Sequence, residues 1–210
     1  MKRLIAAISF ALLAVPAAAR ADVADTTKVS GTWVNGVKGG VNVSTMGGGL
    51  DNTSSHIGAG VGYFFSYRVG NGIAVQPELI VMERGAETVV LAENGRDADL
   101  IATYIDVPIL ARYNVPLQGD FRPYVIAGPA LSLKIDARRM IGSDGTDYDD
   151  ETKLFDFGAH AGAGCDWALG KNTGIALEAR YSIGFTNVLD DGSDDNVKNR
   201  TFSVLFGIWR

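Results

Sequence analysis

The sequence contains little of what metal sites and disulfide-stabilised folds require. Among its 210 residues there are one cysteine and two histidines. The single thiol, Cys165, cannot form an internal disulfide, and it lies among apolar residues, which favours a buried or lipid-facing side chain over a reactive one. A zinc site of the structural type needs a His/Cys cluster, which is absent, as is a glycine-rich phosphate loop.

Long apolar runs are also missing after the N-terminus. No later stretch holds 18 consecutive apolar residues, so transmembrane helices are excluded. The exception is Leu4 to Ala19, which follows the basic pair Lys2 and Arg3 and precedes an A-x-A motif at residues 19–21. These features predict a cleavable signal peptide over residues 1–21, because the apolar stretch is short for an anchor and no stop-transfer pattern follows. No cysteine stands at the cleavage site, so a lipoprotein is not expected.

Basic residues are outnumbered, with 19 Lys and Arg against 24 Asp and Glu. Cleavage after residue 21 removes three bases and no acid, so the formal charge changes from −5 to −8. A net-acidic exported protein without a basic stripe is a poor binder of nucleic acid. We therefore expect no nucleic-acid partner. Residues 22–32 are predicted to be a short periplasmic lead-in to a single domain over residues 33–210.

The sequence does have an alternation of apolar with polar or glycine residues, with a period of two residues. From Leu154 to Asn187, apolar side chains alternate with polar or glycine residues on both sides of a turn at Gly170-Lys171-Asn172. Side chains alternate between the two faces of a strand, so this is a hairpin with one apolar and one polar face. Each run exceeds the roughly 9–11 residues that a tilted strand needs to cross a bilayer. Aromatic residues near the run ends are typical of a membrane interface.

The same alternation predicts eight strands in all. Besides the two in the hairpin, they cover Trp33 to Ser44, Ile57 to Val69, a strand beginning at Ile73, Thr103 to Tyr113, Arg122 to Ile135, and Arg200 to Arg210. Gly70-Asn71-Gly72 predicts a tight turn, and Asn94-Gly95 predicts a hairpin that continues strands three and four beyond the membrane. Pro77 removes one ladder donor, so we expect irregular pairing near it. Residues 136–153 are expected to be a long acidic loop.

The connections alternate between long polar segments and brief turns, as in outer-membrane barrels with short periplasmic turns. The sequence therefore predicts an all-β fold, an eight-stranded antiparallel up-and-down transmembrane β-barrel with the apolar face in lipid. The alternative is a soluble periplasmic or secreted ligand carrier of the lipocalin type, with the apolar face inside. Glycine on the polar face, aromatic ends and long strands favour the membrane.

Several short motifs recur in order along the chain: Gly36-Val37-Lys38-Gly39-Gly40-Val41-Asn42, Gln76-Pro77-Glu78-Leu79, Tyr104-Ile105-Asp106-Val107-Pro108, Arg122-Pro123-Tyr124-Val125 with Gly128-Pro129, and Phe155-Asp156-Phe157-Gly158. With them the chain resembles the small porin-like outer-membrane β-barrel family (PorT-type), related in architecture to OmpA- and OmpX-like barrels. The resemblance implies an outer-membrane location and this fold more firmly than any activity. Such barrels usually end in an aromatic residue, whereas this chain ends Ile208-Trp209-Arg210.

The inward positions of the periplasmic half carry four basic and four acidic residues: Lys38, Arg68, Arg112, Arg180, Glu78, Asp106, Asp166 and Glu178. Buried charges are tolerated when they are paired, so we expect an ion-pair network. A sharper hypothesis is a gate whose pairs rearrange to pass ions. Inward glycines toward the external half, including Gly58, Gly62 and Gly158, predict a wet vestibule above the charges.

Signals for catalysis are poor, so no catalytic, cofactor-binding or metal residue is assigned and the protein is predicted not to be an enzyme. His160 lies near Asp156 on one face, but no nucleophile, base and orienting group can be assembled by spacing. The acidic loops, which contain Asp149 and Asp194, offer oxygen ligands for Ca²⁺ without the EF-hand spacing. We expect outer-membrane lipid as a partner, and an extracellular surface partner bound by the long loops.

Overall fold

The computed structural model describes residues 32–47, 54–90, 97–117, 119–141, 144–147, 155–170, 172–186 and 198–210. Its strands are β1 (Trp33–Gly47), β2 (Ser54–Gly70), β3 (Ile73–Val90), β4 (Asp97–Asn114), β5 (Phe121–Ile141), β6 (Asp144–Asp147), β7 (Phe155–Ala168), β8 (Gly174–Gly184) and β9 (Lys198–Trp209). None of the described residues forms a helix long and apolar enough to cross a membrane. The predicted signal peptide lies outside the described residues and stays a prediction.

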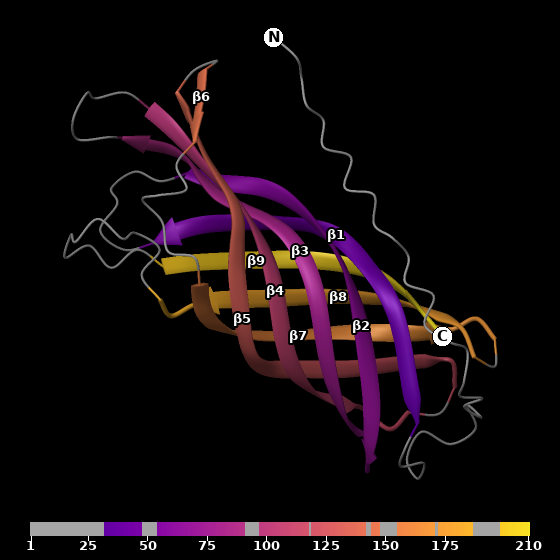
Figure 1. Cartoon of the computed structure of the whole chain (residues 1–210). Coiled ribbons are helices and arrows are strands. Elements are labelled where there is room, and N and C mark those ends of the chain that lie inside the picture. Colours follow the sequence, from indigo (N-terminus) through magenta and orange to yellow (C-terminus); the bar gives the residue numbers. More distant parts are fainter. Residues whose placement is uncertain are drawn as a thin grey trace.

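The strands form one closed antiparallel ring. Neighbours in sequence pair with one another, β5 pairs with β7 as well as β4, and β1 pairs with β9. The ring therefore has eight strands, and the short β6 lies outside it, paired with β5 alone. Figure 1 shows the tilted strands wrapping around a common axis. The predicted eight-stranded up-and-down barrel is confirmed.

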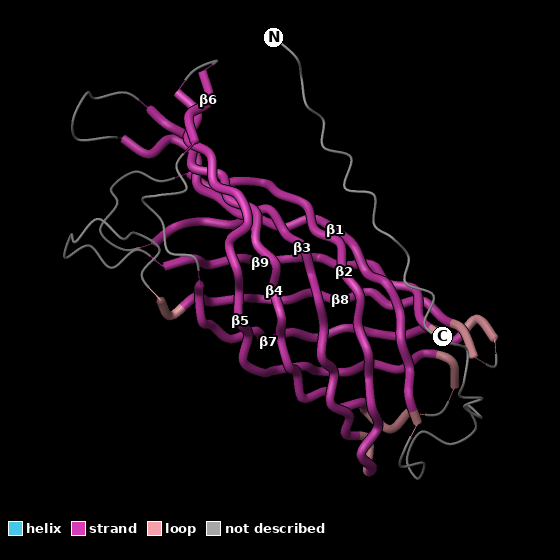
Figure 2. Tube along the Cα trace, viewed as in Figure 1, coloured by secondary structure: helices cyan, strands magenta, loops and turns pink. Residues whose placement is uncertain are grey.

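Turn chemistry at Asn71 and Gly72 agrees with the prediction. Asn71 has φ 51° and Gly72 has φ 77°, the positive values that a two-residue type I′ hairpin turn requires. The described turns, shown as pink tube in Figure 2, lie mainly at the end of the barrel that also holds the C-terminus. Since outer-membrane barrels have short periplasmic turns, this is the periplasmic end.

The ladder between β2 and β3 is interrupted where Pro77 lies. Phe64 pairs with Glu78 and Tyr67 pairs with Val75, but the residues between these two pairs have no partner across the ladder. Proline has no N–H to donate, so the gap has the cause that the sequence indicated. On its other side Pro77 still pairs with Ile109 of β4.

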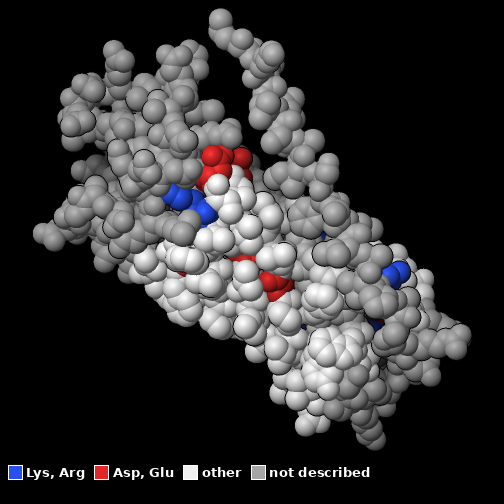
Figure 3. Space-filling model, in the orientation of Figure 1, with Lys and Arg blue, Asp and Glu red and all other residues white. Residues whose placement is uncertain are grey.

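The apolar face of the ring points outward. Ile57 is 70% exposed and Val41 58%, whereas the inward Asp106 and Leu110 are both at 0%. Figure 3 shows the described wall as largely uncharged on the face in view. A soluble carrier would need the opposite arrangement, so that alternative is wrong. The outward band fits hydrocarbon, and the polar groups are enclosed.

Aromatic pairs on the outer wall lie near both ends of the strands. Trp33 and Tyr67 have ring centroids 4.5 Å apart near the periplasmic end, and Phe121 and Trp167 are 5.2 Å apart beside a short turn. At the opposite end the half-exposed Phe157 lies 6.4 Å from Phe185. Aromatic rings at both levels mark the two interfaces of a membrane.

Three strands continue past the external rim. The β3–β4 ladder runs to the pair Val90–Asp97, which confirms that these strands extend as a pair, while the turn predicted at Asn94-Gly95 lies outside the described residues. The prediction of a loop over residues 136–153 is partly wrong, because β5 continues to Ile141 and turns back into β6. Its backbone finds partners on both sides, with Asp99 of β4 opposite Met140. Figure 1 shows this extension projecting beyond the barrel wall.

Candidate functional site

The centre of the barrel is occupied by four ionised side chains in mutual contact. Lys38 Nζ lies 2.8 Å from Glu78 Oε1 and 3.3 Å from Glu178 Oε2. Arg180 donates from Nη1 to Glu78 Oε2 at 2.7 Å and from Nε to Glu178 Oε1 at 2.9 Å. Side-chain exposure is at most 6% for these four residues. The formal charges cancel, which is the condition under which buried ions are tolerated.

Neutral side chains donate additional hydrogen bonds to one oxygen of each carboxylate. Gln76 Nε2 donates to Glu78 Oε1 at 2.7 Å, and the Tyr124 hydroxyl donates to Glu178 Oε2 at 3.0 Å. Because each acceptor is held by several donors from different strands, the network connects opposite walls of the barrel. The predicted ion-pair network is confirmed for this group.

Arg112 extends the network toward the periplasm. Its Nη1 donates to Gln76 Oε1 at 3.1 Å, its Nε to Asn114 Oδ1 at 2.9 Å, and its Nη2 forms an ion pair with Asp166. The guanidinium also lies 3.6 Å from the centroid of the Tyr124 ring, a cation–π contact. Each of the three guanidinium nitrogens of this arginine therefore donates to a group that fixes its position.

Asp106 belongs elsewhere than the sequence suggested. It forms an ion pair with Arg84, and Arg84 Nη1 also lies 3.4 Å from Ser132 Oγ, toward the external half. Arg84 was not among the inward charged residues expected from the sequence. The alternation Glu78, Ile80, Met82, Arg84 was the available signal, because it continues the inward face by steps of two.

The predicted vestibule is largely filled by apolar side chains. Ile80, Met82 and Leu205 form a buried cluster inside the barrel. A Cβ added at Gly62 would lie 2.6 Å from Ile80 Cγ1, and one at Gly60 would lie 3.1 Å from Met82 Cε. The inward glycines thus make room for side chains from the neighbouring strand. An eight-stranded barrel is only wide enough for such filling.

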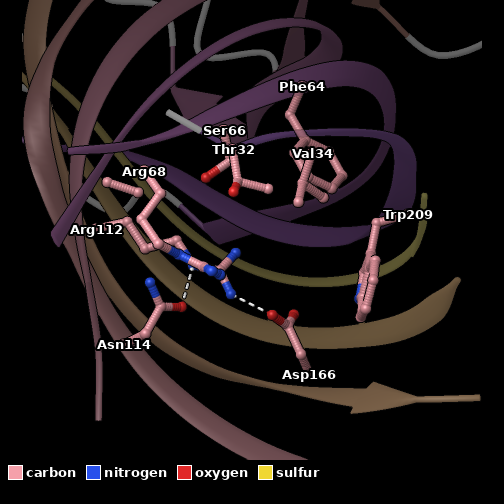
Figure 4. Close-up of a pocket in the computed structure, with 10 residues that line it drawn as sticks. Thr32, Val34, Phe64, Ser66, Arg68, Arg112, Asn114, Asp166 and Trp209 are labelled. Atoms are coloured by element: carbon pink, nitrogen blue, oxygen red, sulfur yellow. Dashed lines mark hydrogen bonds and ion pairs between the residues drawn. The ribbon is translucent and has the colours of Figure 1, made fainter. Parts of the chain in front are cut away.

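Two small cavities lie in the described interior. The external one has a volume of about 10 Å³ and is lined by Arg84, Asp156, His160 and Ser182, among others. The second, of about 30 Å³, lies at the periplasmic end beside Arg68, Arg112 and Asp166. Figure 4 shows these side chains converging on the second cavity. Volumes of this size hold roughly one and roughly two or three water molecules.

His160 is buried in the lumen, as expected, but its neighbour is a cation. Its Nδ1 lies 3.5 Å from Arg180 Nη1, whereas Asp156 accepts a hydrogen bond from the backbone N–H of Thr186 at 3.3 Å. No hydrogen bond joins His160 to Asp156 in the described structure. The geometry therefore brings together no base and orienting carboxylate of the kind that activates a nucleophile.

The acidic loops, which offer oxygen ligands for Ca²⁺ but were assigned no metal site, lie largely outside the described residues. Asp144 and Asp147 end a short strand, and the other acidic residues of both loops are among those the structure does not describe. Within the described ranges no group of three or more His, Cys, Asp or Glu side chains is placed to hold a metal ion. The expectation that these loops hold no metal stays a prediction.

Polar inside, apolar outside and closed by its first and last strands, the domain has the architecture of a membrane barrel. The family model described as "Outer membrane protein beta-barrel domain" matches residues 23–190. The chain belongs to this outer-membrane β-barrel family. Its location is the outer membrane, as the sequence resemblance implied, while the narrower PorT-type name has no separate support.

Solved structures of outer-membrane barrels are similar to this family member. OprG from Pseudomonas aeruginosa matches with a TM-score of 0.55 at 13% identity, covering 88% of this chain and 98% of OprG. Neisserial surface protein A has a TM-score of 0.47 at 17% identity, with coverages of 82% and 95%. Ail from Yersinia pestis, in complex with the heparin analogue sucrose octasulfate, has a TM-score of 0.46 at 17% identity, covering 87% of this chain and 100% of Ail. Comparison with curated proteins finds no match.

Proposed function

We propose that this outer-membrane protein is a closed, non-enzymatic barrel that anchors an external binding surface. One observation carries the proposal: a fully paired ion network and an apolar cluster fill the lumen between the two ends. Arg180 and Glu78 are 1% and 0% exposed, and the described cavities measure about 30 and 10 Å³. A solute has no continuous path through such an interior.

The strand extension supplies the surface. β3, β4 and β5 run past the rim as a paired ladder, and β6 adds a further strand with one unpaired side among the described residues. An exposed strand edge offers backbone donors and acceptors to an extended segment of a partner by β-augmentation. The expected partner is therefore a protein on another cell or surface, bound without any chemistry in the barrel.

A second candidate is a gated pore, and the network itself favours it. Few side chains close the lumen at its centre, and four of them are charged. Their pairing would respond to a change in membrane potential or to the binding of a ligand. In this case Glu78 and Arg112 control the closure, since each is bonded to Gln76 between them. Replacing either one would open a path for ions.

Planar-bilayer recording of the refolded barrel separates the two candidates. A closed anchor gives no discrete conductance in the native protein, whereas a gated pore gives events that Glu78→Gln and Arg112→Gln alter. In parallel, cells carrying the native barrel, a variant trimmed between Glu87 and Arg96, or a variant without Asp144–Asp147 are compared for cell–cell aggregation and surface adhesion. Adhesion that survives both trims, with the variants correctly inserted, would refute the binding role of the strand extension.

A further inference from the structure

The periplasmic cavity has an unusual charge. Its volume is about 30 Å³, and its lining includes Ser66, Arg68, Arg112, Asn114, Asp166 and Trp209. Arg68 and Asn114 are partly exposed, so the cavity opens at the mouth. Figure 4 shows the Arg68 and Arg112 guanidinium groups side by side, with Asp166 across from them.

Three arginines lie around one carboxylate here, two of them (Arg68 and Arg112) in the cavity lining and one, Arg122, beside it. Arg112 is bonded to Asp166, and Arg122 is the cross-strand neighbour of Asp166 in the β5–β7 ladder. Arg122 also lies close enough to Arg68 for the two cations to repel each other. No carboxylate of the described residues forms an ion pair with Arg68 or Arg122. Among the described residues, Arg68 in the lining and Arg122 beside it therefore give an excess of two positive charges.

The excess is local, because the neighbouring network is neutral. Lys38 and Arg180 are balanced by Glu78 and Glu178. Here, by contrast, two polar atoms are buried without a hydrogen-bond partner in the protein, the Oδ1 of Asp166 in the cavity lining and the Nε of Arg122 beside it. A buried donor and acceptor left unpaired each cost free energy, which a suitable ligand would recover.

We propose that this cavity binds a phosphate group, held by Arg68 from the cavity lining and by Arg122 from beside Asp166, with Arg112 fixed behind them. Guanidinium groups match phosphate oxygens in both charge and geometry. The volume suits a group held by some of its oxygens while the others remain in solvent at the open mouth. A hydroxyl of an inorganic phosphate or a monoester would also donate a hydrogen bond to Asp166 Oδ1. A phosphodiester headgroup has no such hydroxyl and cannot make this bond.

The test is calorimetric titration of inorganic phosphate into the full barrel, refolded in an uncharged, phosphate-free detergent at constant ionic strength. Saturable binding is expected, weakened at least tenfold in Arg68→Gln and in Arg122→Gln. Both residues lie outside the ion-pair network, so folding is retained, and heat-modifiable gel mobility verifies it. The matched control is Arg200→Gln, which removes the same charge from an exposed position on β9.

A second arm identifies the source of the phosphate. Dihexanoyl phosphatidylglycerol that competes with inorganic phosphate indicates a lipid headgroup of the inner leaflet; absence of competition indicates a free phosphate or monoester. The proposal is overturned if native barrel shows no saturable binding, if both mouth variants bind like the native protein, or if Arg200→Gln weakens binding equally. None of these outcomes depends on whether the barrel conducts or adheres.

Discussion

The central network allows a quantitative test of charge balance inside the barrel. Arg180 contacts both buried carboxylates, with distances of 2.7 and 3.0 Å to Glu78 and 2.9 Å to Glu178. Arg180→Met keeps most of the side-chain volume but leaves two carboxylates facing Lys38 alone. One uncompensated negative charge then remains in the lumen. We expect the variant to lose about 3–5 kcal/mol of unfolding free energy, the usual cost of breaking a buried pair.

Removing one of the two carboxylate charges as well should restore most of the lost stability. Glu178→Gln is nearly isosteric and can still accept the hydrogen bond from Tyr124. In the double variant Arg180→Met/Glu178→Gln, Lys38 and Glu78 remain as a balanced pair 2.8 Å apart. The double variant should therefore be more stable than the sum of the single losses by about 2 kcal/mol, a coupling typical of one network.

Urea titration in lipid vesicles, followed by tryptophan fluorescence, measures these four stabilities. Arg200→Met is the control for loss of an arginine, because Arg200 is exposed and should change stability by less than about 0.5 kcal/mol. A loss of unfolding free energy below about 1 kcal/mol for Arg180→Met would refute the reasoning, since an unpaired buried charge destabilises a protein by more than that. Strict additivity of the two single changes would refute it as well.

Three further stability predictions use the same titration. Ile109→Arg, on the outer wall, should cost about 2–4 kcal/mol, and Val69→Arg beside the turn about 0–1 kcal/mol; equal costs would contradict the membrane placement. Gly72→Ala should cost about 1–2 kcal/mol because of its positive φ, whereas Gly170→Ala, with no atom within 4 Å of its new Cβ, should cost much less. Leu110→Ala should cost about 2–5 kcal/mol, since Leu110 is 0% exposed inside the barrel; a neutral effect would mean that the lumen is wet.

The fold was predictable from sequence because a strand has a period of exactly two residues in its side-chain directions. That period assigns every residue of a continuous strand to one face, so the outward position of Val41 and the inward position of Glu178 follow from neighbours alone. The turn at Asn71 was predictable for a similar reason, since few residues accept positive φ. Both are local properties of the chain.

The arrangement inside the lumen was less predictable, because it depends on shear between strands. The sequence placed Asp106 with Glu78, but the register of β3 against β4 brings Arg84 to it instead. It also treated the inward glycines as empty space, whereas Ile80 of the adjacent strand fills the position beside Gly62. Which side chain enters the space above a glycine is decided by cross-strand register, and a single sequence contains no direct measure of that.

The pairing of β1 with β9 has a consequence for biogenesis. Gly36 lies opposite Trp209, so the seam of the ring is made by the first and last strands of the barrel. Until β9 is in place, β1 and β8 each have an unpaired edge, and the backbone N–H and C=O groups of that edge find no hydrogen-bond partner in hydrocarbon. The nascent polypeptide must therefore be chaperoned in the periplasm and inserted as a whole, since a truncated intermediate has no stable resting state in the bilayer.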